Sequence, residues 1–339
     1  MTSGEGTQVA VGRPATSAAP IAFVNVSKRY SGRTQAAVGD LSFEVPSGEI
    51  CVLIGPSGCG KTTALKMVNR LIPMTDGDIT IDGRSINALE VSQLRRGIGY
   101  VFQQIGLFPH MTVEDNIGTV PRLLGWPKAR IRERALELLQ LVGLGAEDSL
   151  RRYPGEFSGG QQQRIGVARA MAVDPPIMLM DEPFGAIDPI TRDRLQDDFL
   201  RLHREVRKTI IFVTHDIDEA IKMGDRIAIM RDGRLVQIDT PDNLLAAPAD
   251  EFVADFVGAD RGLKRLRVWA LNDLEQDPYS GDTLPSAPAG TSLRDALSLM
   301  LSAGATRVAV LGPDGTATGS VSLEAIAAML GPEPRTPAP

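Results

Sequence analysis

Residues 55–63 read Gly55-Pro56-Ser57-Gly58-Cys59-Gly60-Lys61-Thr62-Thr63, which matches the pattern G-x-x-x-x-G-K-T. An apolar run at 50–54 precedes the stretch and a helix-like run at 64–68 follows it, as a phosphate-binding loop requires. Glycines let the backbone N–H groups turn toward a phosphate. Lys61 adds a positive charge, Thr62 adds a hydroxyl for Mg²⁺, and the helix start adds its positive end. The stretch therefore predicts a nucleotide site rather than a glycine-rich turn with a chance lysine.

Length and composition limit the remaining possibilities. A chain of 339 residues is expected to hold about two domains. Residues 1–20 are rich in Ser, Thr, Gly, Ala and Pro and lack the apolar stretch of a signal peptide, so we expect a disordered tail. The net charge of −6 and the lack of a Lys/Arg run argue against a nucleic-acid partner. Cys51 and Cys59 have no metal-ligand spacing, which fits a reducing compartment.

Strand-like and helix-like runs divide the chain into three parts. Apolar runs at 21–26, 41–45, 50–54, 177–180, 209–213 and 226–230 predict the strands of one α/β core. Apolar residues at helical spacing predict a helical subdomain inserted at about 105–173. Beyond a Pro/Ala/Gly stretch at 285–290, expected to be a linker, the pattern predicts a helix at 293–301, a β-hairpin turning at 314–315 and a helix at 323–330. The Pro-rich end, 332–339, is expected to be disordered.

Two acids follow the apolar run Ile177-Met178-Leu179-Met180. A buried strand would bring Asp181 to the carboxyl edge of a parallel sheet, where ligands bind. Asp181 could hold Mg²⁺ and Glu182 could deprotonate an attacking water, although an Asp-Glu pair before a proline is also a common solvated turn. His215 follows the run 209–213 and could hydrogen-bond a γ-phosphate. His203 lies in a charged helix and is expected to face solvent.

A second anion site is predicted at Ser158-Gly159-Gly160-Gln161. Ser158 and Gln161 have capping-box spacing, and two glycines at the first helical positions leave bare N–H groups. A capped helix alone would explain the pattern. Because the chain already has one phosphate loop, the second site suggests a dimer with two ATP molecules at its interface. Tyr30 could stack on adenine, and it could equally be a surface tyrosine.

Together these residues resemble the nucleotide-binding subunit of ABC transporters, over about 21–260. The resemblance rests on the phosphate loop, Gln103 in Tyr100-Val101-Phe102-Gln103-Gln104, Ser158-Gly159-Gly160-Gln161, Asp181-Glu182, Asp188 and His215, in that order. It implies that Tyr30 stacks on adenine, that Gln103 reaches Mg²⁺ in the catalytic site and couples to the membrane subunit, and that Asp188 crosses the dimer interface. Phe157 stands where the family signature usually has Leu.

The C-terminal part narrows the resemblance. Residues 256–266, Phe-Val-Gly-Ala-Asp-Arg-Gly-Leu-Lys-Arg-Leu, are similar to the join in ATPase subunits of quaternary-amine importers, which take up glycine betaine, proline betaine, carnitine or choline. The region 261–331 resembles a single CBS repeat. In relatives with two repeats the pair senses ionic strength or binds a nucleotide, but Ala325 stands here at the adenosine-contacting aspartate position.

The resemblance implies a P-loop NTPase core with a helical subdomain, followed by a small α+β CBS-like domain. The expected function is ATP hydrolysis, with Mg²⁺, at the cytoplasmic face of the cell membrane. The expected partners are a second copy of the chain, membrane permease subunits and, indirectly, a substrate-binding protein, with no nucleic acid. Two alternatives are an importer for another solute such as a sugar or polyamine, and a soluble ABC ATPase of DNA repair or translation.

Overall fold

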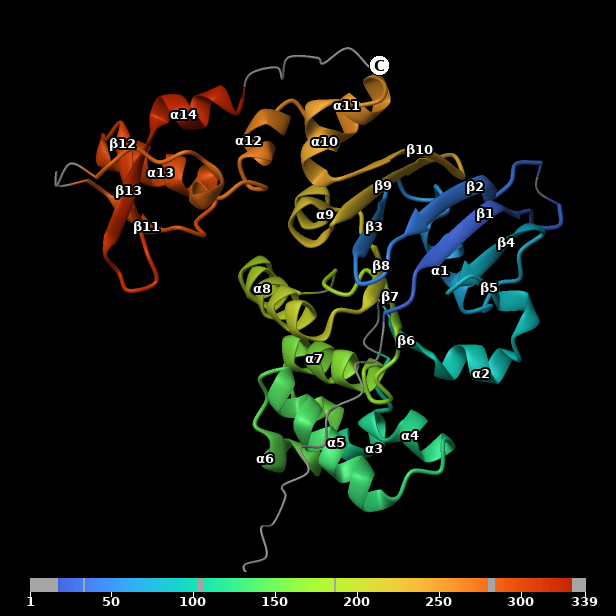
Figure 1. The fold of residues 1–339 in the computed structure, drawn as a ribbon. Helices are drawn as coiled ribbons and strands as arrows, with labels where there is room; N and C mark the ends of the chain where they lie inside the picture. The colour runs from blue at the N-terminus through green and yellow to red at the C-terminus, as the bar shows by residue number, and fades with distance from the viewer. Residues whose placement is uncertain (1–17, 33, 103–105, 186, 280–283, 331–339) are drawn as a thin grey trace, which may run out of the picture.

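Two sheets and a layer of helices form the larger part of the molecule, and a third, small sheet lies toward the C-terminal end (Figure 1). The structure is a computed structural model that describes residues 18–32, 34–102, 106–185, 187–279 and 284–330. Within those ranges, none of the helices combines the length and the hydropathy that a bilayer-crossing segment needs. Of the tails expected at 1–20 and 332–339, residues 1–17 and 332–339 lie outside the described residues.

A six-stranded sheet with the order β10-β9-β3-β8-β7-β6 carries the core. Its strands are β3 (Ile50–Ile54), β6 (Ile98–Val101), β7 (Ile177–Asp181), β8 (Thr209–Val213), β9 (Arg226–Arg231) and β10 (Arg234–Asp239). All neighbours pair in parallel except β10 with β9. In β3, Val52 packs into the core on the helical side, whereas Leu53 packs into the core shared with the second sheet. Burial on both faces explains why the predicted strands read as unbroken apolar runs.

A four-stranded antiparallel sheet with the order β2-β1-β4-β5 covers one face of this core. Its strands are β1 (Ile21–Lys28), β2 (Val38–Val45), β4 (Asp76–Ile81) and β5 (Arg84–Ser85). Residues 18–20, which the sequence assigns to the tail, pack here: Ala19 is buried and the carbonyl oxygen of Pro20 accepts a hydrogen bond from the Asp82 amide at 3.0 Å.

Helices occupy residues 113–170, where the sequence predicts them. They are α3 (Val113–Ile117), α4 (Thr119–Leu123), α5 (Lys128–Leu141), α6 (Ala146–Leu150) and α7 (Gly159–Ala170). Ile131, Ala135 and Leu138 give α5 one buried face, which joins the same apolar core as α7. The core helices are α1 (Lys61–Val68), α2 (Val91–Arg96), α8 (Pro189–Val206), α9 (Ile217–Met223), α10 (Pro241–Ala246) and α11 (Glu251–Val257).

One histidine lies differently from the sequence expectation. His203, on α8, is buried rather than solvent-facing, and its Nε2 donates to the carbonyl oxygen of Lys208 at 2.8 Å. Lys208 is itself buried and pairs with Asp174 at 2.9 Å. The end of α8 is therefore pinned by polar contacts that a count of charges along the helix does not reveal.

The C-terminal unit consists of α12 (Arg261–Arg265), β11 (Ser286–Pro288), α13 (Leu293–Ala303), β12 (Arg307–Leu311), β13 (Ala317–Ser322) and α14 (Leu323–Ala328). The hairpin β12–β13 is confirmed, but the linker expected at 285–290 is wrong. That segment contains β11, which pairs in parallel with β12. A short edge strand tolerates Pro288, because its N–H side need not enter the ladder.

A largely buried ion pair joins the C-terminal unit to the larger part of the molecule. Arg265 of α12 donates from two guanidinium nitrogens to the two carboxylate oxygens of Asp242, at 2.7 and 3.2 Å. Trp269 Nε1 donates to the same carboxylate at 2.9 Å. Burial opposes the charge of Asp242, but these hydrogen bonds outweigh it and hold its pKa below the ordinary value.

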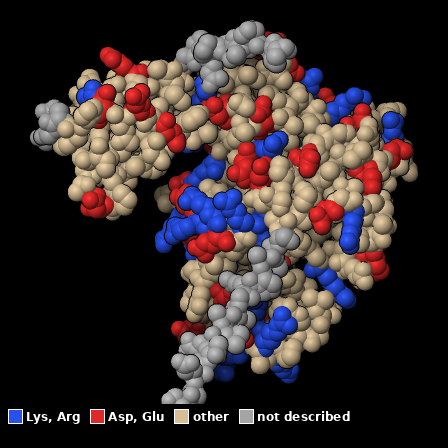
Figure 2. Space-filling view, in the orientation of Figure 1, with Lys and Arg blue, Asp and Glu red and all other residues tan. Residues whose placement is uncertain are grey.

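Figure 2 shows a hollow on the surface between the C-terminal unit and α8.

Candidate functional site

The loop between β3 and α1 has the backbone geometry that a phosphate cradle needs. Gly58 and Gly60 have φ angles of 81° and 104°, which L-residues rarely adopt. A Cβ atom at Gly60 would lie 2.4 Å from the carbonyl oxygen of Ala37, and one at Gly55 would lie 2.1 Å from that of Met230. Close backbone approach therefore requires Gly55 and Gly60, and the backbone angle favours glycine at 58.

Lys61 begins α1 and is buried, with 7% of its surface exposed. Its Nζ donates to the carbonyl oxygens of Gly55 at 2.7 Å and Pro56 at 3.1 Å. The loop thus folds around its own lysine. A phosphate would offer the ammonium group charged acceptors, which make stronger hydrogen bonds than carbonyl oxygens do.

The carboxyl end of β7 places Asp181 beside Thr62. Thr62 Oγ1 donates to Asp181 Oδ1 at 3.0 Å across a sequence separation of 119 residues. Burial raises the pKa of Asp181 above its ordinary value, partly offset by the hydrogen bond from Thr62. A hydroxyl and a carboxylate facing one space are hard oxygen ligands of the kind that Mg²⁺ shares with phosphate oxygens and water. The residues present therefore fit a magnesium ion.

Glu182 has a left-handed backbone, with φ of 44°. Its amide donates to the carbonyl oxygen of Val213 at 2.9 Å, which fixes the turn against the end of β8. Its Oε2 lies 3.3 Å from Nδ1 of His215, which follows the same strand. The ends of two neighbouring parallel strands thus bring the two predicted catalytic side chains into contact.

The phosphate loop, Glu182 and His215 share one cleft with a volume of about 590 Å³, whereas Asp181 is outside its lining and contacts it through Thr62. Its lining includes Tyr30, Ser57, Gly58, Gly60, Lys61, Thr62, Thr63, Glu182 and His215. Tyr30 lies at the edge of the cleft with Lys28 Nζ 5.1 Å from its ring centroid. Tyr30 therefore lies where an adenine ring could stack, and its role stays a prediction.

The second predicted group lies elsewhere. Ser158, Gly159, Gly160, Gln161 and Asp188 are outside the lining of the cleft among the described residues. Ser158 caps α7: its hydroxyl accepts from the Gln161 amide at 3.3 Å, and Gln161 Oε1 accepts from the Ser158 amide at 3.0 Å. The capping box is confirmed. Asp188 caps α8, and the backbone hydrogen bond from Thr191 lowers the pKa of its carboxyl. Gln103 lies outside the described residues.

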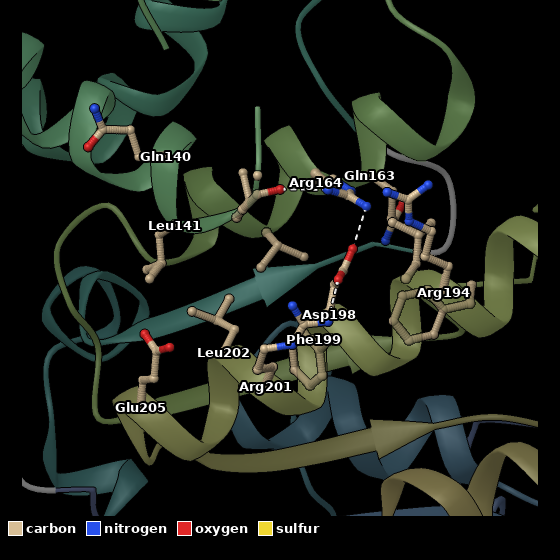
Figure 3. A pocket seen from close by; sticks show the side chains of 15 residues that line it. Gln140, Leu141, Gln163, Arg164, Arg194, Asp198, Phe199, Arg201, Leu202 and Glu205 are labelled. Carbon is tan, nitrogen blue, oxygen red and sulfur yellow. Dashed lines mark hydrogen bonds and ion pairs between the residues drawn. The ribbon is translucent and has the colours of Figure 1, made fainter. Parts of the chain in front are cut away.

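A second cavity, of about 410 Å³, opens between the end of α5, α7 and α8 (Figure 3). Arg164, which lines it, pairs with Asp198 at 2.6 Å and donates to the carbonyl oxygen of Val142 at 3.0 Å. None of the predicted site residues that the structure describes lines this cavity. This cavity lies where α5 and α7 of the helical subdomain meet α8, and it is separate from the phosphate cleft.

Two residues near the cleft escape the sequence reasoning. Tyr100 precedes the end of β6, and its burial and the charge of Asp181 raise the pKa of its phenol. Arg192, in the first turn of α8, donates to the carbonyl oxygen of Ile187 at 3.0 Å and lies 3.7 Å from Asp216. Neither has a motif of its own; their only signal is nearness in sequence to Gln103 and Asp188.

Comparison with known proteins gives consistent matches. The profile of the family described as "ABC transporter" matches residues 38–185. An osmoprotectant import ATP-binding protein, OsmV of Salmonella typhimurium, is 52% identical over 304 residues, covering 89% of this chain and 78% of that protein. The choline transport ATP-binding protein OpuBA of Bacillus subtilis is 50% identical, with coverage of 89% and 78%. The glycine betaine uptake ATP-binding protein YehX of Escherichia coli is 45% identical, with coverage of 90% and 98%.

Solved structures agree with the fold. A bacterial ABC transporter cassette, solved as a dimer, has a TM-score of 0.58 and 35% identity, covering 65% of this chain and 98% of that one. The structure of cbiO1 from Clostridium perfringens, part of an ABC transporter complex, has a TM-score of 0.62 and 25% identity, covering 68% and 91%.

Proposed function

The chain belongs to the family of ABC transporter ATP-binding proteins, and on this premise we propose that it powers import of quaternary amines such as glycine betaine, choline or carnitine. The observation that supports the solute class most is the agreement of relatives named for osmoprotectant, choline and glycine betaine transport, which extends over about nine tenths of the chain. Members of this family hydrolyse ATP, and the chain is an ATPase.

The cleft supplies the groups for that reaction. Glycine N–H groups and Lys61 would hold the β- and γ-phosphates, and Glu182 would take a proton from the attacking water. His215, 3.3 Å from Glu182, would hydrogen-bond the γ-phosphate and orient the carboxylate. Thr62 and Asp181 would hold Mg²⁺, which would neutralise charge on the phosphates when bound. We assign Gln103 to the same shell on the family resemblance.

The active unit is proposed to be a dimer of this chain. Ser158 to Gln161 and Asp188 lie outside the lining of the cleft, so a second copy would have to bring them to the nucleotide. Bare N–H groups at the start of α7 suit a γ-phosphate, because a helix N-terminus attracts anions. A similar cassette that was solved as a dimer supports the arrangement.

Further partners are proposed from the family. Two permease chains would span the membrane, a substrate-binding protein would deliver the solute to them, and this subunit would dock at their cytoplasmic face.

We propose an ATP-binding domain at 21–260, with its helical subdomain at about 105–173. Residues 261–331 would form a single CBS-like unit. Ala325, on α14, has no carboxylate for a ribose, so we assign this unit a bracing or salt-sensing role rather than nucleotide binding.

Reconstitution with its own membrane partners tests the proposal. The tagged chain is purified from native membranes together with the chains that copurify, and the complex is placed in vesicles. ATP-dependent uptake of labelled glycine betaine, choline or carnitine is expected, with no uptake of maltose or spermidine. Uptake of the sugar or the polyamine instead would assign the chain to another class of importer.

A further inference from the structure

A polar layer of four residues, three of them buried, lies between α8 and α9 and includes the residue before His215. We define it by four residues, Arg192, Gln196, Thr214 and Glu219. Gln196, Thr214 and Glu219 are 5%, 2% and 6% exposed. Gln196 Nε2 donates to Glu219 Oε1 at 2.9 Å, and the hydroxyl of Thr214 also hydrogen-bonds the Glu219 carboxyl. Polar groups buried this deeply fix geometry, because a lost partner leaves an unsatisfied group.

The layer holds both residues that flank His215. Thr214, on one side, accepts a hydrogen bond from the Asp216 amide at 3.1 Å. Asp216, on the other side, caps α9 by accepting from the amides of Asp218 and Glu219 at 2.9 and 3.2 Å. The His215 side chain itself is 65% exposed, so its direction is set largely by this backbone segment rather than by packing around the ring.

Arg192 extends the layer to the loop before α8. One guanidinium nitrogen donates to the carbonyl oxygen of Ile187, the neighbour of Asp188, and another lies 3.7 Å from Asp216. One side chain therefore touches the segments next to Asp188 and next to His215. Its Nε is buried without a hydrogen-bond partner among the described residues, so its position is set by those contacts rather than by a full set of hydrogen bonds.

We propose that Arg192 and Glu219 are positioning residues for ATP hydrolysis: they hold the Asp188 and His215 loops in one register, so that His215 keeps its contact with Glu182 when a second copy arrives at Asp188. The inference rests on the proposed dimeric mechanism. Neither residue is in the lining of the phosphate cleft. Glu219 orients the His215 segment through Thr214, and Arg192 links that segment to Asp188.

The test measures steady-state ATPase kinetics of full-length Arg192→Met, which keeps the side-chain length but removes the donors. We expect kcat to fall by on the order of 10- to 100-fold, as misplacement of a reacting group by about 1 Å does, with KM for ATP within about twofold of the parent. Arg204→Met is the matched control, on the same helix and exposed. It should behave as the parent does. An unchanged kcat in Arg192→Met would overturn the proposal.

A second measurement separates positioning from a general loss of structure. In a His215→Ala background, single-turnover hydrolysis should lose little more when Arg192→Met is added, since Arg192 acts through His215. If the two losses multiply, Arg192 acts elsewhere and the proposal fails. Glu219→Gln, which can still hydrogen-bond Thr214, should retain far more kcat than Glu219→Ala; equal loss in both would count against positioning by Glu219.

The same experiments separate this inference from the proposed function. The parent chain and Glu182→Gln are assayed alongside. If Glu182→Gln abolishes hydrolysis while Arg192→Met leaves it unchanged, the proposed mechanism stands and only the positioning role is lost. If Glu182→Gln turns over normally, the proposed function of the cleft fails first.

Discussion

Glu182 carries the chemistry at the scale of single residues. Glu182→Gln should keep ATP binding and nearly abolish hydrolysis, because an amide cannot take a proton from water. Its contact with His215 Nδ1, at 3.3 Å, can survive the change. The variant should accumulate as an ATP-bound dimer in size-exclusion chromatography. Glu133→Gln, an exposed acid on α5, is the control. Normal turnover of Glu182→Gln would contradict the assignment of the base.

Ser158 tests the composite site. Ser158→Arg should block hydrolysis and leave nucleotide binding to the phosphate loop largely intact, since Ser158 lies outside the cleft of its own chain. The bulky cation would fill the place of the second copy's γ-phosphate. Ser158→Ala is the milder comparison and loses the cap of α7, worth about 1 kcal/mol. Loss of ATP binding in the arginine variant would show that Ser158 serves another site.

Asp242 makes a pH-dependent contribution at the scale of elements, where α10 meets α12. Its folded pKa lies below the ordinary value of 3.8, so its contribution to stability is present above about pH 4 and is lost as the pH falls toward the folded pKa. Asp242→Asn removes the carboxylate charge that two guanidinium nitrogens of the buried Arg265 contact. Breaking a buried pair costs roughly 3–5 kcal/mol.

The measurement is limited proteolysis together with thermal unfolding. At pH 7, Asp242→Asn should loosen the C-terminal unit, with earlier cleavage between α11 and α13. Between about pH 4 and 3 the difference from the parent should shrink. If the difference between the parent and Asp242→Asn stays constant on acidification, the charge of the Asp242 carboxylate does not hold α10 and α12 together. Asp255→Asn, on exposed surface of α11, controls for the loss of one acid.

The elements that the sequence predicts best are those with one dominant physical cause. β3, β7 and β8 are buried on both faces, so an unbroken apolar run identifies each of them. Their carboxyl ends lie at the same edge of the sheet. The sequence alone therefore predicts that the phosphate loop, Asp181, Glu182 and His215 lie close together. β11 was missed because its three residues, Ser286–Pro288, have turn-like composition and become a strand only by pairing with β12. Arg192 was missed because one arginine in a charged helix has no distinctive spacing.

Removal of the C-terminal unit is a test at the scale of the whole molecule. A chain ending at Arg267 keeps the pair between Arg265 and Asp242 and should retain basal ATPase activity, since no described residue beyond Arg267 lines the cleft. A chain ending at Asp260 lacks Arg265 and Trp269, the side chains that donate to Asp242, and should be less stable. Both are compared with the full chain by ATPase rate and thermal midpoint. Equal stability of the two truncations would contradict the importance of the joint.

Removal of the C-terminal unit should change the salt dependence of transport, although it leaves the basal ATPase activity unchanged. If two C-terminal units pair through charged faces in the transporter, that pairing weakens as salt rises, because the screening length falls from about 10 Å at 0.1 M to about 3 Å at 1 M. Transport in vesicles is measured over a range of internal salt for the full chain and for the chain ending at Arg267. The truncated chain should lose the salt response. A response that survives truncation would leave the unit with a bracing role only.

The joint at Asp242 also bears on how such a chain can evolve. Domain shuffling succeeds most readily where a junction cuts few contacts, and Gly258, just after α11, looks from the sequence like such a place. A recombinant made there would inherit Asp242 from one parent and a foreign residue opposite it from the other. The partly buried carboxylate of Asp242 would then favour a compensating change, either a new cation in the incoming segment or an uncharged residue at 242. Asp242 and Arg265 are thus expected to be inherited as a pair. The C-terminal unit can be exchanged freely only after Asp242 has been replaced by an uncharged residue.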